Sequence, residues 1–446
     1  MHLDRQAKKY RAWPSSSELK INMMDVQILG AWVVTQNEKR EILKTNIGIQ
    51  DGRILCMGSD TINARTVFRE DHALIVPAYH NLHLHFGEYY LRGIPAPNTE
   101  AYILMGEKFH QALGSHAGQV RRSSIRNTLY ESMLHGTLTV FGMRGWPHVS
   151  EFPVYAYLGY PLMKSEKLQS YIDNFEDQFA ALPCNFADEY FIAIHSLKWV
   201  DRKLLQELMR FREKNPQIKF SLHAAETSSE IDYIRREYQC TPIQLLDSCG
   251  LLDKNTLLVH CNYLSQEDIT LIRKGGCTVA VCHNSNLKLG NKPCGLESLL
   301  AADINVVLGS DGPATSDSLS MLDSMKITAL LSGLEEQKIF DMATINPAKY
   351  LGRQTGRIAE GMAADLLFYD RRELAFTYPQ SAVHNLMYNT AVRPYKVMKA
   401  GEVIIDRYEF LNTDFQTILP EKAETLEGLA SLINWNQITG DNHDKD

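Results

Sequence analysis

The middle of the chain, residues 73–359, alternates short runs of apolar and β-branched residues with amphipathic helical stretches. This rhythm is typical of β–α units, whose successive strands pair in parallel. Eight candidate strands can be counted, starting at Ala73, Gly136, Pro153, Phe191, Lys219, Leu257, Thr278 and Asn305. Because eight such units close into a (β/α)8 barrel, the TIM barrel, we predict this α/β fold for residues 73–359. A doubly wound open sheet is the alternative.

Two β-rich segments flank this middle region, at residues 21–72 and 360–412. Each carries a turn dipeptide, Asp51-Gly52 in the first segment and Ala400-Gly401 in the second. Since the two ends of a domain often lie close together, we predict that the flanks form one small β-sandwich. We predict that residues 413–446 form a C-terminal extension. From Pro420 onward we expect a poorly ordered tail, because the chain ends in the polar run GDNHDKD.

Composition narrows the class of protein. The formal net charge of -7 argues against a nucleic-acid-binding surface, which needs clustered Lys and Arg. No stretch approaches the roughly 20 apolar residues of a membrane span, and residues 1–19 lack the apolar run of a secretory signal. The eight cysteines show no CxxC pair, which favours reduced thiols. We therefore expect a soluble, cytoplasmic protein with neither nucleic acid nor membrane as a partner.

Ligand-capable side chains stand where the predicted strands end. They are His83, His85, His195, His223, His260 and Asp311. In a TIM barrel the chemistry is found at the carboxyl ends of the strands, so this placement predicts a functional site at that end. Histidines without such a role would be scattered over helix surfaces and loops.

The spacing His83-Leu84-His85 puts two imidazoles on one face of a strand, from which both could reach one ion. Two partly exposed loop histidines are the alternative. With His223 and the strand-end carboxylate of Asp311, the set fits one catalytic Zn²⁺, although Fe²⁺ would accept the same ligands. Glu226, three residues after His223, is close enough to act on a substrate at that ion. An acid that merely favours the first turn of a helix is the alternative for Glu226.

The order of several sequence blocks resembles a known family. The blocks are the HxH pair followed by LRG, YESMLHGTLTV, SLHAAET, LLVHCNYLS, SNLKLG, VVLGSDG, TINPAKYLG, GRIAEGMAADLLFYD and VMKAGEVIID. From about residue 26 to residue 409 the chain resembles the amidohydrolase superfamily. The similar branch contains chlorohydrolases, guanine and cytosine deaminases, and adenosylhomocysteine/methylthioadenosine deaminases.

The resemblance implies a role for each strand-end residue. His83, His85, His223 and Asp311 would bind one divalent metal ion, and Asp311 would also accept a proton from the attacking water. Glu226 would carry a proton to a ring nitrogen of the substrate. A further implied role is that His260 hydrogen-bonds the water or the nascent oxyanion, while His195 contacts the substrate. A structural strand-end histidine is the alternative for both of these residues.

Two departures from the family pattern affect the expected pocket. The seventh predicted strand has Val281 where relatives carry a histidine, and His283 is displaced, so its role is left open. The stretch from residue 143 to residue 155 is short, and we name Arg144 and Trp146 in it, together with Tyr89, as candidate substrate contacts; surface loop positions are the alternative for the first two. Lys198 lies too far past its strand to bridge two ions, which favours one ion.

The function predicted from these residues and this resemblance is hydrolytic deamination of an amino-substituted heterocycle, nucleobase- or nucleoside-like, with release of ammonia. Hydrolysis of another C–N bond or of a C–halogen bond is the alternative within enzymes. A non-catalytic metal-binding homologue is the alternative outside them. The resemblance also implies a homodimer and a small heterocyclic molecule as the binding partner.

Overall fold

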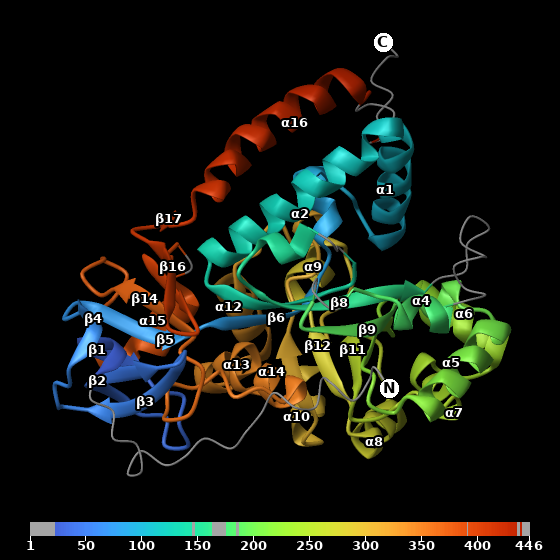
Figure 1. The fold of residues 1–446 in the computed structure, drawn as a ribbon. Helices are drawn as coiled ribbons and strands as arrows, with labels where there is room; N and C mark the ends of the chain where they lie inside the picture. Colours follow the sequence, from blue (N-terminus) through green and yellow to red (C-terminus); the bar gives the residue numbers. More distant parts are fainter. Residues whose placement is uncertain are drawn as a thin grey trace.

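The computed structural model describes residues 23–144, 148–162, 175–183, 187–389, 391–434 and residue 438. Within these residues the strands form two sheets, one of eight strands and one of nine (Figure 1). Trp146 lies outside the described residues. No described helix is long and apolar enough to span a membrane.

The eight-stranded sheet is an all-parallel barrel at the centre of the molecule. Its strands are β6 (Tyr79–Leu84), β7 (Thr137–Gly142), β8 (Tyr155–Leu162), β9 (Glu189–Ile194), β10 (Phe220–Ala224), β11 (Thr256–His260), β12 (Thr278–Val281) and β13 (Asn305–Leu308). A parallel bridge between Leu84 and Asp311 joins the first strand to the chain leaving the last, and the Asp311 N–H donates to the His83 carbonyl over 3.0 Å. The barrel prediction is confirmed, and the open-sheet alternative is wrong because β6 and β13 meet.

Helices follow the barrel strands and cover the barrel (Figure 1). They are α2 (Ala117–Leu134), α4 (Phe175–Ala180), α5 (Arg202–Lys214), α6 (Ser228–Tyr238), α7 (Pro242–Ser248), α8 (Gln266–Gly275), α9 (His283–Lys288), α10 (Leu296–Ala301), α11 (Pro313–Ser316), α12 (Met321–Ser332), α13 (Glu336–Ala343) and α14 (Ile345–Leu351). Helix α8 illustrates how particular residues begin and end these helices. Ser265 and Asp268 form a reciprocal capping box at its start, and Gly276 takes a left-handed conformation (φ 70°) at its end.

Further helical segments lie in the connections between the barrel strands. They are the 3₁₀ helices η3 (Phe86–Leu91), η4 (Gly114–His116), η5 (His148–Glu151) and η7 (Leu197–Trp199), and the helix α1 (Thr99–Leu113). Helix α1 runs beside α2 (Figure 1) and borders the pocket that the strand-end histidines line. Its residues Thr99, Glu100, Tyr102 and Ile103 therefore contribute to the wall of the pocket described below.

The flanking segments join in one nine-stranded mixed sheet. It consists of β1 (Met24–Val34), β2 (Ile42–Gln50), β3 (Arg53–Gly58), β4 (Ala64–Arg69), β5 (Ala73–Pro77), β14 (Leu366–Asp370), β15 (Lys396–Lys399), β16 (Glu402–Asp406) and β17 (Glu409–Phe410). The antiparallel pair β5–β14 joins the N-terminal strands to the C-terminal ones. Ile28, Ile47, Phe368 and Met398 belong to a hydrophobic core of this sheet that is separate from the barrel core. The pairing of the two flanks was expected, and the two-layer sandwich stays a prediction.

The structure corrects one predicted boundary. The sequence pattern places Ala73–Pro77 in the first barrel strand. The run is β5 and pairs with β1 and β14 in the flanking sheet. The chain changes sheet at the next two residues, where the Ala78 N–H donates to the Asp365 carbonyl and the Tyr79 N–H to the Gly136 carbonyl, both over 3.0 Å. The sequence ALIVPAY is apolar throughout, so it carries no alternation that could mark this change.

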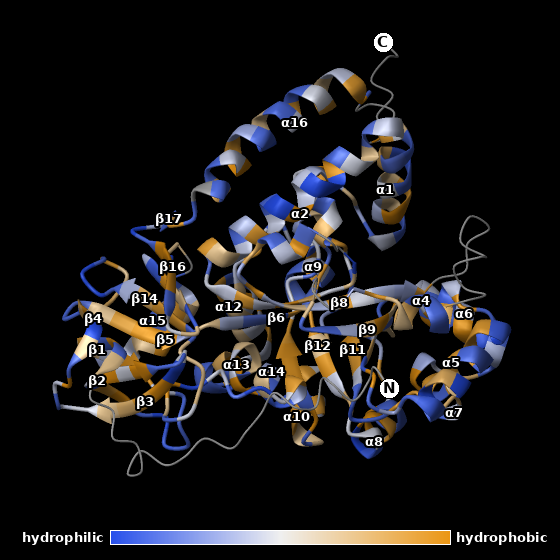
Figure 2. Cartoon of the chain, viewed as in Figure 1, coloured by the Kyte–Doolittle hydropathy of each residue, from blue (hydrophilic) through white to orange (hydrophobic). Residues whose placement is uncertain are grey.

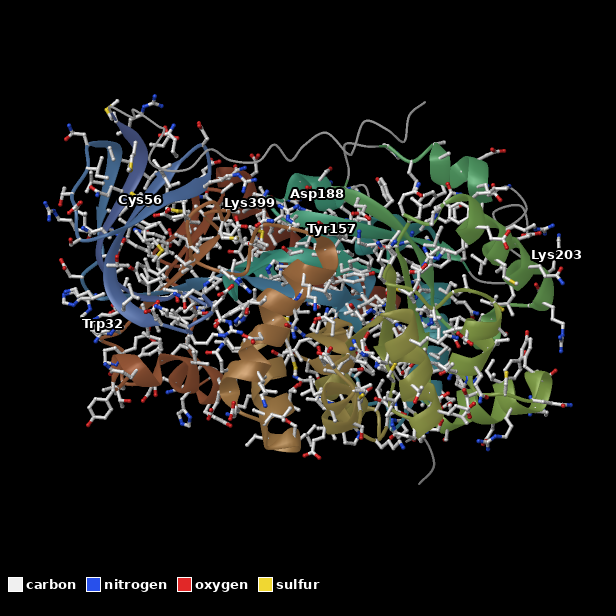
Figure 3. All side chains as sticks on the ribbon, turned by 90° about the horizontal axis from the view of Figure 1, so that it is seen from below. Trp32, Cys56, Tyr157, Asp188, Lys203 and Lys399 are labelled. Atoms are coloured by element: carbon white, nitrogen blue, oxygen red, sulfur yellow. The ribbon has the colours of Figure 1, made fainter. Side chains whose placement is uncertain are left out.

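The flanking sheet is attached at the amino ends of the barrel strands, opposite the histidines. Figure 3 shows Lys399 of β15 beside Asp188 and Tyr157 of the barrel. The ring of Tyr155, at the start of β8, lies 3.6 Å from the Arg353 guanidinium carbon and 4.3 Å from the Lys399 ammonium. These contacts fix the sheet to the end of the barrel that is remote from the predicted chemistry.

The remaining helices follow the barrel in sequence: α15 (Ala382–Tyr388) with the 3₁₀ helix η8 (Pro379–Ser381), and α16 (Ile418–Leu432) preceded by the 3₁₀ helix η9 (Thr413–Thr417). The expectation of a poorly ordered tail from Pro420 is wrong for α16, which lies along α2 (Figure 1). Figure 2 shows hydrophobic and hydrophilic residues alternating along α16. Leu429 of α16 and Ile433, the residue that follows the helix, belong to one hydrophobic cluster with Tyr90 and Met105, and this burial orders the helix.

Candidate metal centre

Three imidazoles converge at the carboxyl end of the barrel, from β6, the residue after it, and β10. The Nε2 atoms of His83 and His223 are 3.0 Å apart, and that of His85 lies 3.1 Å from His83 and 3.4 Å from His223. Asp311, just after β13, places Oδ1 3.3 Å from the Nε2 atoms of both His83 and His85. The structure thus brings together the four residues that the sequence predicts as metal ligands.

The donor set fits a divalent cation. Burial lowers the pKa of His83, and it lowers the pKa values of His85 and His223 well below the usual range, so the rings are neutral with lone pairs to offer. Three convergent ring nitrogens cannot all satisfy one another by hydrogen bonding, because each neutral ring has one N–H. Three imidazoles and a carboxylate are a ligand set that suits zinc and leaves a position for a further ligand.

Glu226 and His260 stand on the open side of this cluster. A carboxylate oxygen of Glu226 (Oε2) lies 3.9 Å from His223 Nδ1 and 4.0 Å from His260 Nε2. Burial raises the pKa of Glu226, while the neighbouring His260 lowers it. A carboxyl with a raised pKa keeps its proton to a higher pH than an ordinary one, which suits a group that exchanges protons.

A chain of amide side chains orients His260. Its Nδ1 lies 2.9 Å from Asn286 Oδ1, the Asn286 amide donates to Asn262 Oδ1 over 2.7 Å, and the Asn262 amide donates to the Glu226 carbonyl over 3.0 Å. Because the amide oxygen of Asn286 faces Nδ1, that nitrogen donates to it, and Nε2 is the ring nitrogen on the side of Glu226. His260 and Asp311 also have positive φ values of 71° and 62°, a conformation that non-glycine residues adopt at functional sites.

A pocket opens over the cluster. Its lining includes the expected His85, His195, His223, Glu226, His260 and Asp311, together with Glu88, Tyr102, Lys198, Trp199 and Leu289. His195 lies with its ring 4.7 Å from the ring of Trp199. Burial, then the positive charge of Arg144, lowers the pKa of His195 to about 3, so this ring enters the pocket neutral. Arg144 itself is exposed and close enough to act on both His195 and His85.

Tyr89 is placed differently from the expectation, because it is not among the described residues that line the pocket. The 3₁₀ helix η3 turns its ring away, where Arg92 and Lys422 of α16 lie 5.1 Å and 5.4 Å from the ring centre. Arg92 pairs with Glu131 over 2.7 Å, in accord with a role in bracing the loop.

Neither Val281 nor His283 is among the described residues that line the pocket. Val281 is buried in β12. His283 is buried at the start of α9, with Nδ1 3.0 Å from Thr328 Oγ1 of α12. Its position is that of a packing residue. Lys198 lines the pocket, and its Nζ donates to Ser229 Oγ over 3.3 Å.

Three residues of this region were missed from the sequence. Glu88 follows His85 by three positions and Trp199 follows His195 by four, so both carry the spacing of one turn after a strand end. Asn286 belongs to the SNLKLG block, which contributes to the family resemblance but was given no role of its own. Burial, reinforced by the negative charge of Asp311, raises the pKa of Glu88 to about 8.

Comparison with known proteins places the chain among relatives of one family. The model of the amidohydrolase family matches residues 74–404. The chain is 26 % identical over 429 residues to the 5-methylthioadenosine/S-adenosylhomocysteine deaminase of Pyrococcus furiosus, covering 89 % of this chain and 99 % of the relative.

Two solved structures share the fold. An adenosine deaminase from Xanthomonas campestris with bound zinc superimposes with a TM-score of 0.81 at 19 % identity, covering 92 % of this chain and 99 % of that one. The atrazine chlorohydrolase TrzN from Arthrobacter aurescens, complexed with zinc, gives 0.77 at 18 % identity, covering 90 % and 99 %. With the family model matching most of its length, the chain belongs to the amidohydrolase family.

Proposed function

We propose that this protein is a metal-dependent hydrolytic deaminase of an amino-substituted heterocycle, with a nucleoside-like purine as the leading class. The observation that carries the proposal is the convergence of His83, His85, His223 and Asp311, with Glu226 3.9 Å from His223 on the pocket side. The name of the Pyrococcus furiosus relative, which spans nearly the same length, supports an adenosine-like ring.

In this proposal the four clustered residues would hold one divalent ion, which supplies a water whose pKa is lowered from 15.7 toward about 7. Asp311 accepts a proton from the attacking water. Glu226 donates a proton to the ring nitrogen beside the amino-bearing carbon, which makes that carbon electrophilic. His260, held by Asn286, directs Nε2 at the oxygen that adds. A C–O bond forms; the amine takes the proton that Asp311 accepted and leaves as ammonia as the C–N bond breaks, and Glu226 regains a proton from the product.

The finer points of the proposal concern the metal and the assembly. Zinc is favoured because the ligand set suits it and because both structural relatives named above contain it. Metal analysis of the purified protein tests zinc against iron. The homodimer and the cytoplasmic location stay predictions, which light scattering and cell fractionation would test.

Substrate contacts are proposed for His195 and Arg144, because His195 lines the pocket and the charge of Arg144 reaches it. The ring of Trp199 beside His195 offers a flat surface for a heterocycle. Tyr89 faces the opposite direction, toward Lys422, so a substrate contact there requires a movement of η3.

The test is ammonia release by the zinc-loaded protein from a panel of adenosine, 5'-deoxyadenosine, 5-methylthioadenosine, S-adenosylhomocysteine, guanine and cytosine. We expect release from at least one purine, with one equivalent of ammonia for each hydroxyl-substituted product. Atrazine with a halide assay forms the arm for C–halogen hydrolysis. A protein that holds its metal yet releases ammonia from none of these compounds would contradict the proposal.

A further inference from the structure

Glu88 lies directly behind one of the clustered histidines. It belongs to η3, three residues after His85, and its side chain is four-fifths buried. The carboxylate oxygen Oε1 lies 3.4 Å from His85 Nδ1, the ring nitrogen that faces away from the cluster. A histidine that binds a metal through Nε2 commonly donates its Nδ1–H to a carboxylate, which fixes the tautomer and the ring plane.

The other two clustered histidines lack such a partner. Among the described residues, His83 Nδ1 has no hydrogen-bond partner. The carboxylate nearest to His223 Nδ1 is that of Glu226, at 3.9 Å, and Glu226 is engaged in the proposed proton transfer. Of these two carboxylates, Glu88 is therefore the one that lies behind a clustered histidine and takes no part in the proposed proton transfer.

Gly312 makes room for this carboxylate. A Cβ built on Gly312 would lie 1.9 Å from Glu88 Oε2 and 3.0 Å from its carboxyl carbon. The φ of Gly312 is -78°, which any residue adopts, so an added Cβ here would displace the Glu88 carboxylate rather than strain the backbone. Gly312 follows Asp311, so the turn that carries this cluster residue also carries the glycine against which the Glu88 carboxylate lies.

The geometry of Glu88 argues against a substrate contact as its main role. Oε2 is shielded from solvent and lies where a Cβ on Gly312 would be, while Oε1 lies 3.4 Å from His85 Nδ1. Glu88 also borders the pocket, and its carboxylate interacts with the Tyr102 hydroxyl. The two oxygens are nevertheless placed against Gly312 and His85.

We propose that Glu88, seated on Gly312, is a positioning residue for the metal centre: it holds the Nδ1–H of His85 so that Nε2 points at the ion. The proposal rests on the metal site of the proposed function, but not on deamination. It assigns a role to two residues, Glu88 and Gly312, and predicts that their substitutions act through the same histidine.

The test is metal binding without substrate. Metal-free protein is titrated with Zn²⁺ against a chromophoric chelator, and with Co²⁺ while the visible spectrum reports the ligand geometry. We expect Glu88→Ala to weaken Zn²⁺ binding about 10–100-fold, the range typical for loss of such a partner. Glu88→Gln keeps an acceptor oxygen and should restore most of the affinity.

Gly312→Ala supplies the independent arm, since its methyl group occupies the place of Oε2. It should weaken Zn²⁺ binding as Glu88→Ala does, and the double variant should be no weaker than either single one. Gly87→Ala is the matched control, because a Cβ there meets no atom within 4 Å. Circular dichroism verifies that each variant is folded.

Wild-type Zn²⁺ affinity and an unchanged Co²⁺ spectrum in folded Glu88→Ala would overturn the proposal, and would assign Glu88 to the substrate if KM alone rose. Additive losses in the double variant would also overturn it. If the wild-type protein bound no divalent ion, the proposed metal site itself would fail, an outcome distinguishable from the failure of Glu88.

Discussion

His83 and His223 hold their Nε2 atoms 3.0 Å apart, although 140 positions separate them in the chain. Strands β6 and β10, on different sides of the barrel, set this distance. Buried strands change little on ligand binding, so the ligand geometry is largely formed before an ion arrives.

Removal of the metal should therefore abolish activity without unfolding the barrel. Dialysis against a chelator is expected to eliminate ammonia release and to lower Tm, since an ion at about 100 times its Kd stabilises the fold by about 2.7 kcal/mol. The far-UV circular dichroism should stay unchanged, and Zn²⁺ should restore both activity and Tm. Full activity in protein shown by mass spectrometry to lack metal would be incompatible with the proposed centre.

Glu226→Gln should remove proton transfer and leave the metal in place. We expect kcat to fall by about 10²–10⁴-fold, the usual contribution of general acid–base catalysis, with unchanged zinc content. Glu237→Gln, an exposed carboxylate on α6, is the control and should behave as the wild type. Steady-state kinetics with metal analysis checks this, and retained turnover in Glu226→Gln would assign the proton to another group.

Asn286→Ala should release His260 from its hydrogen bond. The expected result is a decrease in kcat of about 10–100-fold, typical for loss of an orienting partner, with KM nearly unchanged because the pocket wall is intact. Asn286→Asp keeps the oxygen that faces Nδ1 and should recover part of kcat. Equal losses in the two variants would show that Asn286 acts through packing alone.

His80 should make the metal-free protein less stable in acid. Burial, then the charge of Arg353, lowers its pKa to about 3, and both ring nitrogens lack hydrogen-bond partners among the described residues. Below its unfolded pKa of about 6.5 the unfolded chain binds a proton that the folded chain refuses. The free energy of unfolding should thus fall as the pH drops from about 6.5 toward 3, by up to about 1.4 kcal/mol per pH unit.

Urea unfolding of His80→Gln across this pH range should give a shallower slope than the wild type. His110→Gln, at an exposed position on α1, should leave the slope unchanged. A wild-type slope in His80→Gln would mean that His80 is protonated in the folded protein.

Glu421→Gln should loosen α16. The Arg126 Nη1 lies 2.7 Å from both carboxylate oxygens of Glu421, and Arg126 is only 6 % exposed. Because this buried cation would lose the nearer of its two carboxylate partners, Glu421 and Glu151, we expect a loss of about 1–3 kcal/mol in the free energy of unfolding. The exposed Glu424→Gln is the control. Equal stabilities of the two variants in chemical denaturation would show that the pair contributes nothing.

Barrel and ligand set were predictable because both follow from regular patterns. Eight apolar runs separated by helices predict eight parallel strands, and polar residues at strand ends predict where chemistry gathers. The shared end of the strands brings His83, His223 and Asp311 together whatever the loops do.

Features set by irregular segments were not predictable in this way. The ring of Tyr89 turned out to face α16 because η3 is a 3₁₀ turn, and no period in the sequence fixes where a side chain points there. The tail from Pro420 onward was expected to be poorly ordered because the polar run GDNHDKD ends the chain, and this run concealed the apolar residues of α16. The proposed role of Glu88 depends on the close approach of its carboxylate to Gly312, a contact between segments more than 200 positions apart in the chain.

The nine-stranded sheet has a consequence for synthesis. Pro77 of β5 pairs with Leu366 of β14, 289 positions later. At about 5–20 residues per second the ribosome needs roughly 15–60 s to deliver that partner. During this interval the apolar strand β5 has one edge without its final neighbour, a condition that invites pairing with other nascent chains. The exposed edge of β5 can be closed only once β14, in the last fifth of the chain, has been made.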